Sequence, residues 1–524
     1  MTEKSKFVIM SVQSFLTKYK GDIDMKKQAL WIRLLVLALA LAMMVSVFAA
    51  CSTEDEEGNA EQNGTRETEE GSGSEEEVEI TDDLDGVYFD GASLRILIDK
   101  SYGAQVAPTE ELAAGNPVRE VIYKRNETVQ ERLGVNIQWI TSQGGGSSGT
   151  KIVLQEVETA CETDPLDAIC VYNLTPYTLA INGLCANLYD EDNYLDLTAP
   201  WWPADLLNEI TVNDTLYAIT ESNDYGLLRN MMAMFFNADL LEARGMESPY
   251  DLVEKDQWTI DKLSEMIKDT YDDVNGDGKR DKDDVYGYIN ATDSKRDAWF
   301  FGLGNRFAET RDGAPVSVVD GDHIQVYIDR MLDFYTDDTM LFDHANHGGR
   351  GQNLMFLNEK AYFYSTGIFT TEQIKDREAT FEYGVVPMPK MNSAQDRYYT
   401  HLSNTYDTWC VSFNAKNQDI VSAVLECMAS EAYRQIGPVY FDTYVKLRYA
   451  SNEKLGPMYD LVRDSVTFDL IYLYSSVYPS GSNPRTLVKS CITNPDANKW
   501  GSIYAGNKDI WASSFQSIVD TYAK

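Results

Sequence analysis

Short apolar runs alternate with amphipathic stretches from about residue 86 to the C-terminus. The run Leu94–Ile98 is the length of a buried strand. An amphipathic stretch then begins at Asn116-Pro117 and stops at Gly134, which are typical first and last residues of a helix. Val135–Trp139 alternates like a second strand. Strand, helix and strand in this order predict a βαβ unit, and therefore a parallel sheet covered by helices.

The same α/β pattern recurs in the rest of the chain. Apolar runs predict further strands at residues 231–236, 361–364, 383–386 and 409–411. Apolar residues at helical spacing predict further helices at residues 240–244, 259–267 and 420–429. The alternation of the two element types predicts the α/β class throughout the folded part of the chain.

A basic segment followed by an apolar one lies near the N-terminus. Lys26 and Lys27 precede the apolar core Leu34–Phe48, and the small residues Ala49-Ala50 stand directly before Cys51. This order is typical of a bacterial signal peptide that spans residues 25–50, after which Cys51 supplies a thiol for lipid attachment. An uncleaved transmembrane anchor is the alternative, although the 17 residues of Leu34–Ala50 fall slightly short of the about 20 that a span requires.

The segment before Cys51 resembles the bacterial lipobox, with Phe48 where Leu is usual. The resemblance implies a mature lipoprotein that begins at Cys51, carries fatty-acyl chains such as palmitate, and is lipid-anchored to the outer face of the cell membrane. Met25 looks like the true start, so residues 1–24 are expected to be a gene-model extension. Residues 51–85 are acidic and small, which predicts a disordered tether.

Charge and length narrow the possible functions. The formal net charge of −38 excludes a nucleic-acid partner, which would require a basic surface, and disfavours direct adhesion to anionic lipid. The body of roughly 440 residues is long enough for two or three domains.

Six cysteines remain after Cys51, and no C-x-x-C pair occurs. They are expected to be buried, reduced thiols, and a disulfide among Cys161, Cys170 and Cys185 is the alternative.

Four segments carry a family resemblance. They are residues 121–129, 234–241, 258–263 and 383–390. Together with the lipoprotein start they resemble extracellular solute-binding proteins of ABC importers, in the carbohydrate-type family of Gram-positive bacteria. The resemblance implies a monomer that captures a small carbohydrate for the subunits of an ABC permease, with no catalytic residues.

The resemblance also implies a two-lobed, periplasmic-binding-protein-like fold of type II, whose lobes are joined by hinge crossings. Lobe one is expected at 86–218 plus 365–409, and lobe two at 219–364 plus 410–524. The crossings are expected near 217–220, 363–365 and 409–411.

An acidic loop at residues 273–284 resembles the calcium-binding loop of an EF-hand. Oxygens at alternate positions of a tight turn can converge on one Ca²⁺, and Gly278 would permit the turn. Position 12 holds Asp rather than the usual Glu, and an acidic turn without an ion is the alternative. The predicted ligands are Asp273, Asn275, Asp277, Lys279 (through its carbonyl), Asp281 and Asp284.

A sugar site needs aromatic platforms with planar polar groups beside them. Side chains of these kinds follow the predicted strand ends and crossings. The candidates are Tyr172, Asn173, Asp224, Tyr225, Trp299, Phe300, Tyr406, Asp407 and Trp409.

Catalytic motifs do not stand out. His344 and His347 lack the H-E-x-x-H pattern, and the chain has neither a G-x-S-x-G elbow nor a P-loop. A secreted glycoside hydrolase and a calcium-dependent cell-surface scaffold remain the alternative functions.

Overall fold

The computed structural model describes residues 81–524 except 190–192, 291–293, 312, 337–340, 344–351, 446–452, 494–498 and 524. The chain divides into two compact units, Met1–Val78 and Glu79–Lys524, and all described residues belong to the second unit. The expected signal peptide, Cys51, most of the tether, His344 and His347 therefore lie outside the described residues. Every described helix is too short or too polar to cross a membrane.

The first sheet has the strand order β2-β1-β3-β11, with β11 antiparallel to β3 and the other neighbours parallel. Its strands are β1 (Ala92–Ile98), β2 (Val135–Thr141), β3 (Ala168–Tyr172) and β11 (Asp407–Val411). A bridge between Ile219 and Trp409 continues this sheet beyond β11.

The second sheet has the strand order β8-β5-β9-β4-β10, and here β4 is the antiparallel strand. Its strands are β4 (Met232–Asn237), β5 (Tyr286–Asn290), β8 (Leu341–Asp343), β9 (Ala361–Gly367) and β10 (Tyr383–Val386). The two sheets thus repeat one order. In both, the antiparallel strand is the first strand after the chain has crossed from the other sheet. This strand is β11 in the first sheet and β4 in the second.

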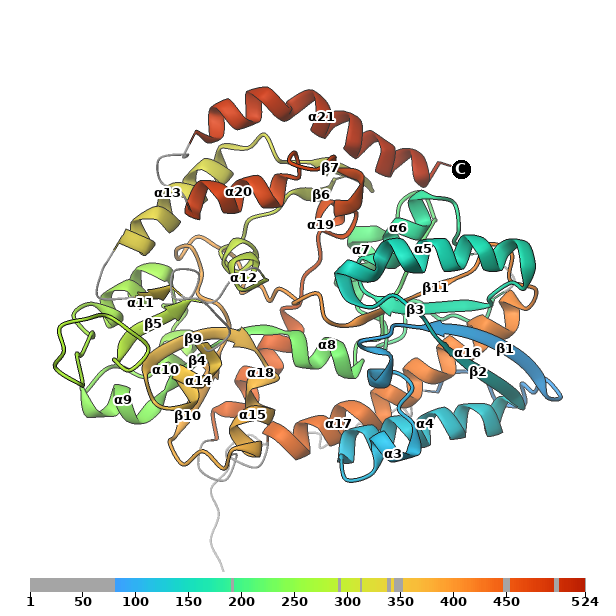
Figure 1. The fold of residues 1–524 in the computed structure, drawn as a ribbon, viewed down its shortest axis with the longest axis horizontal. Helices are drawn as coiled ribbons and strands as arrows, with labels where there is room; N and C mark the ends of the chain where they lie inside the picture. The colour runs from blue at the N-terminus through green and yellow to red at the C-terminus, as the bar shows by residue number, and fades with distance from the viewer. Residues whose placement is uncertain are drawn as a thin grey trace, which may run out of the picture. The chain divides into compact units, whose positions relative to one another are not determined.

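Helices cover both faces of the first sheet (Figure 1). α4 and α16 pack together on one face, while α5 and α6 contact β3 from the other. The helical segments associated with this sheet are η1 (Gly103–Gln105), α3 (Glu110–Ala113), α4 (Pro117–Leu133), α5 (Gly146–Thr163), α6 (Thr175–Ile181), α7 (Ala204–Ile210) and α16 (Gln418–Glu431).

The second sheet has its own helices and a separate hairpin. The helices are α9 (Ala238–Ala243), α10 (Pro249–Glu254), α11 (Ile260–Ile267), α12 (Ser294–Gly302), α13 (Asp322–Thr336), α14 (Gln352–Leu357) and α15 (Thr370–Asp376). The hairpin pairs β6 (Ala308–Arg311) with β7 (Ala314–Ser317).

The C-terminal part of the chain contacts elements of both sheets. α18 packs on β10, whereas α21 contacts α6 as well as β7 and α20 (Figure 1). The segments are η3 (Ala432–Ile436), α17 (Gly437–Tyr440), η4 (Phe441–Val445), α18 (Leu455–Asp464), α19 (Leu470–Leu473), η6 (Ser475–Val477), α20 (Pro484–Thr493) and α21 (Trp500–Thr521).

Two segments that cross between the sheets run side by side. The first, residues 220–231, contains α8 (Tyr225–Asn230), and the second spans residues 387–406. Their backbones pair at Met231 and Leu402, and the Ser403 N–H donates to the Asn230 carbonyl at 2.9 Å. A third segment of the chain lies beside the second crossing, because the Thr400 N–H donates to the Ser465 carbonyl at 2.7 Å.

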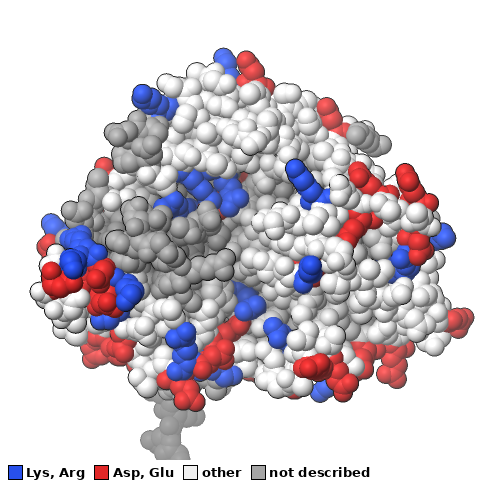
Figure 2. Space-filling model, in the orientation of Figure 1, with Lys and Arg blue, Asp and Glu red and all other residues white. Residues whose placement is uncertain are grey.

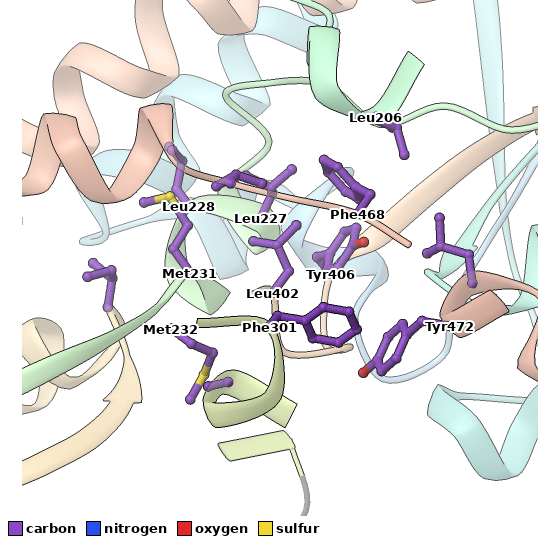
Figure 3. Close-up of a cluster of buried hydrophobic side chains, with 14 of the residues drawn as sticks. Leu206, Leu227, Leu228, Met231, Met232, Phe301, Leu402, Tyr406, Phe468 and Tyr472 are labelled. Atoms are coloured by element: carbon purple, nitrogen blue, oxygen red, sulfur yellow. The ribbon is translucent and has the colours of Figure 1, made fainter. Parts of the chain in front are cut away.

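Apolar side chains fill the space around the crossings (Figure 3). Leu228 and Met231 come from the first crossing, Leu402 and Tyr406 from the second, and Phe468 from the segment that pairs with the second crossing at Thr400. Burying this surface away from water stabilises the crossings against each other.

Several expected elements are confirmed. Asn116 caps α4 by accepting from the Arg119 N–H at 3.0 Å, and Gly134 ends the helix at φ 62°. Thr259 caps α11 by accepting from the Lys262 N–H at 3.2 Å. The six cysteines among the described residues are free, and all except the partly buried Cys161 are buried.

The assignment of segments to lobes differs from the expected one. Residues 363–365 lie inside β9 and residues 409–411 inside β11, so neither stretch is a crossing. β10 falls in the range expected for lobe one but pairs with β4 of the second sheet. The reason is that apolar periodicity identifies a strand without identifying its sheet. Below, lobe one is the first sheet with its helices and lobe two is the second sheet with its helices.

Candidate functional site

The ends of β1 and β3 place polar and aromatic side chains at one edge of the first sheet. In α/β folds, ligands bind outside the carboxyl ends of such strands. Asp99 follows β1 and is 2% exposed. It accepts from the backbone N–H groups of Ser101 at 2.7 Å, Tyr102 at 3.1 Å and Gly146 at 3.0 Å. Asp99 therefore ties the loop after β1 to the start of α5.

This loop brings Tyr102 against Tyr172, the last residue of β3. The two rings stack with centroids 6.4 Å apart at an angle of 28°. Burial raises the pKa of Tyr172 to about 12, against the lowering effect of the nearby Arg485. Tyr172 was a predicted site residue, whereas Asp99 and Tyr102 were missed. Their position directly after the apolar run Leu94–Ile98 was the signal that could have found them.

Amide side chains connect lobe one to the second crossing. Asn173 donates from Nδ2 to the Asn404 side-chain oxygen at 3.3 Å, and the Tyr472 hydroxyl donates to the same oxygen at 2.9 Å. Asn404 belongs to the second crossing, and Tyr472 lies in α19. Asn404 is thus the point at which lobe one, the crossing and the C-terminal segment meet.

A cluster of charged side chains lies next to Tyr472. Asp297 of α12 accepts from Arg485 Nε at 3.0 Å and Nη2 at 2.6 Å, and Lys489 Nζ lies 3.0 Å from its Oδ2. Burial alone would raise the pKa of Asp297, but Arg485 and Lys489 hold it well below its usual value. The Arg485 guanidinium lies over the Tyr472 ring, 4.7 Å from its centroid. We call Asp297, Arg485 and Lys489 the charged triad.

His401 lies next to the triad without being available for acid–base chemistry. Its ring stacks on Phe301 with centroids 4.8 Å apart and is 4% exposed. Burial and the positive charges of Arg485 and Lys489 lower its pKa to about 3, against the opposing effect of Asp297. The ring is therefore neutral at pH 7.

The structure brings four predicted residues together, namely Tyr172, Asn173, Tyr406 and Asp407. Asp407 pairs with Tyr172 across β11 and β3, and the Asn173 N–H donates to the Tyr406 carbonyl at 3.0 Å. Asp407 is 1% exposed, and neither carboxylate oxygen has a hydrogen-bond partner among the described residues. Burial, with Asp224 and Asp99 nearby, raises its pKa well above the usual value.

Two further predicted residues lie in the first crossing. Asp224 caps α8 by accepting from the Leu227 N–H at 2.7 Å, and burial and then Glu221 raise its pKa to about 7. Tyr225 is 2% exposed and packs edge-on against Tyr440, 5.9 Å away.

The remaining predicted aromatic residues lie in the cores of the lobes. Trp299 is fully buried and donates to the Tyr288 hydroxyl at 2.8 Å. Phe300 stacks on Phe307 at 4.3 Å. Trp409 is 2% exposed and lies 6.5 Å from the Trp139 ring.

A cavity of about 960 Å³ lies apart from these strand ends. It is lined by residues 197–208 of lobe one, by the first crossing and by α17 and α18, with the rings of Trp202, Tyr433, Phe441 and Phe468 among them. Tyr433 is 37% exposed there. The cavity contains none of the predicted ligand-binding residues.

The loop at residues 273–284 is closed by a pair of backbone hydrogen bonds between Asp272 and Val285, at 3.0 and 3.1 Å. The Asp273 carboxylate accepts from the N–H groups of Gly276 at 2.8 Å and Gly278 at 2.9 Å. Both glycines adopt a positive φ, at 70° and 69°, which supplies the turn. The predicted ligand Asp273 is thus bonded to the loop's own backbone.

Asp284, at the last position of the loop, is fully buried. Its Oδ2 accepts from the Tyr271 hydroxyl at 2.8 Å, while Oδ1 has no hydrogen-bond partner among the described residues. The unpartnered oxygen fits a cation. The described residues nevertheless contain no group of three carboxylate, imidazole or thiol side chains arranged to hold a metal ion. An ion would require the Asp273 and Asp277 carboxylates to turn from the backbone.

No protein-family model and no curated protein matches the chain. Among solved structures, the chain is similar to the GacH receptor of Streptomyces glaucescens, with 13% identity and a TM-score of 0.51, over 81% of this chain and 99% of that one. It is also similar to the apo form of RafE from Streptococcus pneumoniae, with 12% identity and a TM-score of 0.50, over 83% and 98%. The chain therefore has the two-lobed, type II periplasmic-binding-protein-like fold that the sequence predicted.

Proposed function

We propose that the protein captures a carbohydrate between its two lobes and delivers it to an ABC permease. The observation that carries the proposal is the stacked pair of Tyr102 and Tyr172, with Asn404, Tyr472 and Arg485 nearby. Aromatic faces bind the C–H faces of sugars, and amide and guanidinium groups bind their hydroxyls.

The solved neighbours support this proposal. GacH, which shares the fold, was solved both unliganded and in complex with acarbose and an acarbose homologue. We infer binding without turnover, because the charged and titratable side chains of the site are tied to each other. Asp297 is held by two cations, His401 is buried and neutral, and Asp407 is closed to solvent.

The test is isothermal titration calorimetry of the purified protein against a sugar library, with solution scattering of each complex. We expect at least one oligosaccharide to bind and to reduce the radius of gyration, because a ligand that touches both lobes favours the closed state. Tyr172→Ala should weaken binding by about 1–3 kcal/mol through the lost ring contact. Tyr433→Ala, in the cavity that lies apart from the strand ends, is the matched control and should bind normally. Release of shorter sugars by the pure protein would refute binding without turnover.

We also propose that Cys51 carries a lipid that anchors the protein to the outer face of the membrane. The order of basic, apolar and small residues before Cys51 supports this anchor. Metabolic labelling with a palmitate analogue should label the parent but not Cys51→Ala, which should accumulate as an unprocessed precursor. Equal processing of the parent and of Cys51→Ala would refute the lipid anchor.

We propose that Ca²⁺ binds the 273–284 loop and stabilises lobe two. The unpartnered Oδ1 of the buried Asp284 supports this site, with Asp273, Asn275, Asp277, the Lys279 carbonyl and Asp281 as the other ligands. Extracellular sites of this type bind with a Kd of about 10⁻⁴–10⁻³ M. Millimolar Ca²⁺ would therefore add about 1 kcal/mol to the free energy of unfolding.

The calcium test is the melting temperature with Ca²⁺ and with EDTA. The parent should melt lower in EDTA, and the double variant Asp273→Ala/Asp277→Ala should melt at one temperature in both. Asp283→Ala, which replaces an exposed carboxylate that is not a predicted ligand, is the matched control. A parent protein whose melting temperature changes with neither Ca²⁺ nor EDTA would contradict the calcium site.

A further inference from the structure

Asp407 at the start of β11 is a carboxylate removed from water. Carboxylates at the surface, such as those along the lower rim of the face drawn in Figure 2, are solvated. Asp407 is 1% exposed, and both of its carboxylate oxygens lack a hydrogen-bond partner among the described residues. Burial, then Asp224 and Asp99, raise its pKa, and no cation is among these influences. A buried charge of this kind is costly unless it is paired or coordinates a metal ion.

A second buried oxygen without a partner lies in the same region. The Gln105 side chain is 9% exposed, and its Oε1 accepts no hydrogen bond from any residue that the structure describes. Gly226 shows where this oxygen points, because a Cβ built on that glycine would lie 2.2 Å from Gln105 Oε1 and 3.0 Å from Asp224 Oδ1. The Cα of Tyr406, the residue before Asp407, lies 3.0 Å from the same position. Gly226 thus lets two side-chain oxygens approach each other beside the start of β11.

The charges of this region are not balanced by the one cation that accompanies them. Burial raises the pKa of the Cys170 thiol, and Asp407, Asp224 and Glu221 raise it further, which shows that these three carboxylates surround it. Arg125 is the one cation among the same influences. Its Nη1 lies 3.1 Å from Glu221 Oε2, so Arg125 neutralises Glu221 and leaves the other two carboxylates.

The donor set indicates the kind of ion. Asp407 can offer two oxygens, Gln105 one and Asp224 one, and sets made only of oxygen suit hard cations. Asp224 is already stabilised as the cap of α8, where it accepts from the Leu227 N–H at 2.7 Å. The charge that remains is that of Asp407, which matches a singly charged ion. The set holds two carboxylates and an amide, in keeping with the lack of a three-residue carboxylate, imidazole or thiol group among the described residues.

We infer that an alkali-metal cation, Na⁺ or K⁺, binds between Asp407, Gln105 and Asp224. The ion joins β11 to η1, which follows Tyr102, and to the first crossing, which contains Asp224. It replaces the proton that burial otherwise favours on the Asp407 carboxyl. The site is separate from the calcium loop and does not depend on carbohydrate binding.

The experiment compares the melting temperature of the purified full-length protein, in detergent, in NaCl, KCl and choline chloride. Ionic strength is equal in the three salts, the pH is about 8.5 so that the carboxyl can lose its proton, and EDTA is present as its choline salt. Choline carries the same charge but is too large for a site between three side chains. A Kd of about 10 mM would raise the melting temperature by about 2 °C at about 150 mM Na⁺ or K⁺, and the salt with the larger shift identifies the ion.

Asp407→Asn is the informative variant, because it keeps the shape of the side chain and removes its charge. It should melt at one temperature in all three salts. Asp167→Asn is the matched control, since Asp167 is another buried carboxylate of lobe one but already accepts from the Arg95 N–H at 2.8 Å. It should keep the parent's difference between the salts. Gln105→Glu adds a carboxylate oxygen to the site and should enlarge that difference.

Each outcome decides the inference. A parent that melts equally in the three salts would show that only water or a proton occupies the site, and would overturn it. Retention of the salt difference in Asp407→Asn, or its loss in Asp167→Asn, would overturn the assignment to these residues. A smaller difference in Gln105→Glu would show that the Gln105 amide donates to the carboxylates, which also overturns it.

A crystal grown in RbCl gives a readout that does not depend on stability. An anomalous peak in contact with the Asp407 and Gln105 oxygens is expected, since Rb⁺ is an alkali-metal cation with strong anomalous scattering. This result would decide the inference even if Asp407→Asn failed to fold. Data without a peak at these oxygens would overturn it.

Discussion

Arg125 and Glu221 form a buried ion pair that joins α4 to the first crossing. Arg125 Nη1 lies 3.1 Å from Glu221 Oε2, and both side chains are 3% exposed. Arg125 also donates from Nη2 to the Val106 carbonyl at 3.2 Å and from Nε to Asn126 Oδ1 at 3.0 Å. Burial raises the pKa of Glu221, while Arg125 lowers it.

Removing one partner should cost more than removing both. Arg125→Met leaves the Glu221 carboxylate buried without its cation, which lowers the free energy of unfolding by about 3–5 kcal/mol. Glu221→Leu should cost a similar amount, because it leaves the Arg125 guanidinium buried without its carboxylate. The double variant replaces both charges with apolar groups and should lose less than the sum of the single variants, by at least about 2 kcal/mol. It should still fall short of the parent, because Asn126 Oδ1 loses the Arg125 N–H groups that donate to it.

Calorimetric melting of the four proteins measures this cycle. For a body of about 440 residues the unfolding entropy is about 0.9 kcal/mol per degree, so each single variant should melt about 3–5 °C lower. Arg125→Met should also become less stable as pH rises, because its buried Glu221 is stable in the fold only when protonated. A double variant whose loss equals the sum of the two single losses would refute the reasoning, since it would show that the two side chains do not interact.

Three further predictions concern buried groups. Burial raises the pKa of Glu426 to about 7, so its contribution to stability is full below about pH 4.5 and is lost as pH rises through 7. The melting temperature should fall over this range, and less so in Glu426→Gln. Asp297→Asn should lower the free energy of unfolding by about 3 kcal/mol in urea titrations, because it removes the buried carboxylate that accepts two hydrogen bonds from Arg485. Trp409→Phe should lower it by about 1–2 kcal/mol without changing the Kd for sugar, because the ring packs in lobe one.

Local patterns were sufficient to predict most individual elements. The boundaries of α4 follow from Asn116, Pro117 and Gly134, each of which acts on its own neighbours in the chain. The same holds for Tyr172 and Asn173, since polar residues after a buried strand lie at the carboxyl edge of a parallel sheet. Tyr172 and Asn173 were therefore accessible from the sequence.

The rest of the candidate site depends on contacts between distant segments. Arg485 and Asp297 are 188 positions apart, and no local pattern marks either as the partner of the other. Trp299 and Trp409 were predicted as sugar platforms because aromatic residues near strand ends can serve either a site or a core. Only the packing of the two lobes, which places Trp299 against Tyr288 and Trp409 against Trp139, separates these roles.

On the proposed function, the position of Asn404 would link ligand binding to the relative movement of the lobes. Asn404 lies in the second crossing and accepts from Asn173 of lobe one and from Tyr472 of the C-terminal segment. A ligand held by Tyr172 on one side and Arg485 on the other spans this point, so it gains contacts only when both sides approach. The free energy of those contacts is the differential affinity that shifts the population toward the closed state. A ligand that reached only the Tyr102–Tyr172 pair would bind without closure. Scattering profiles of complexes with Tyr172→Ala should accordingly show less compaction than the parent at equal saturation.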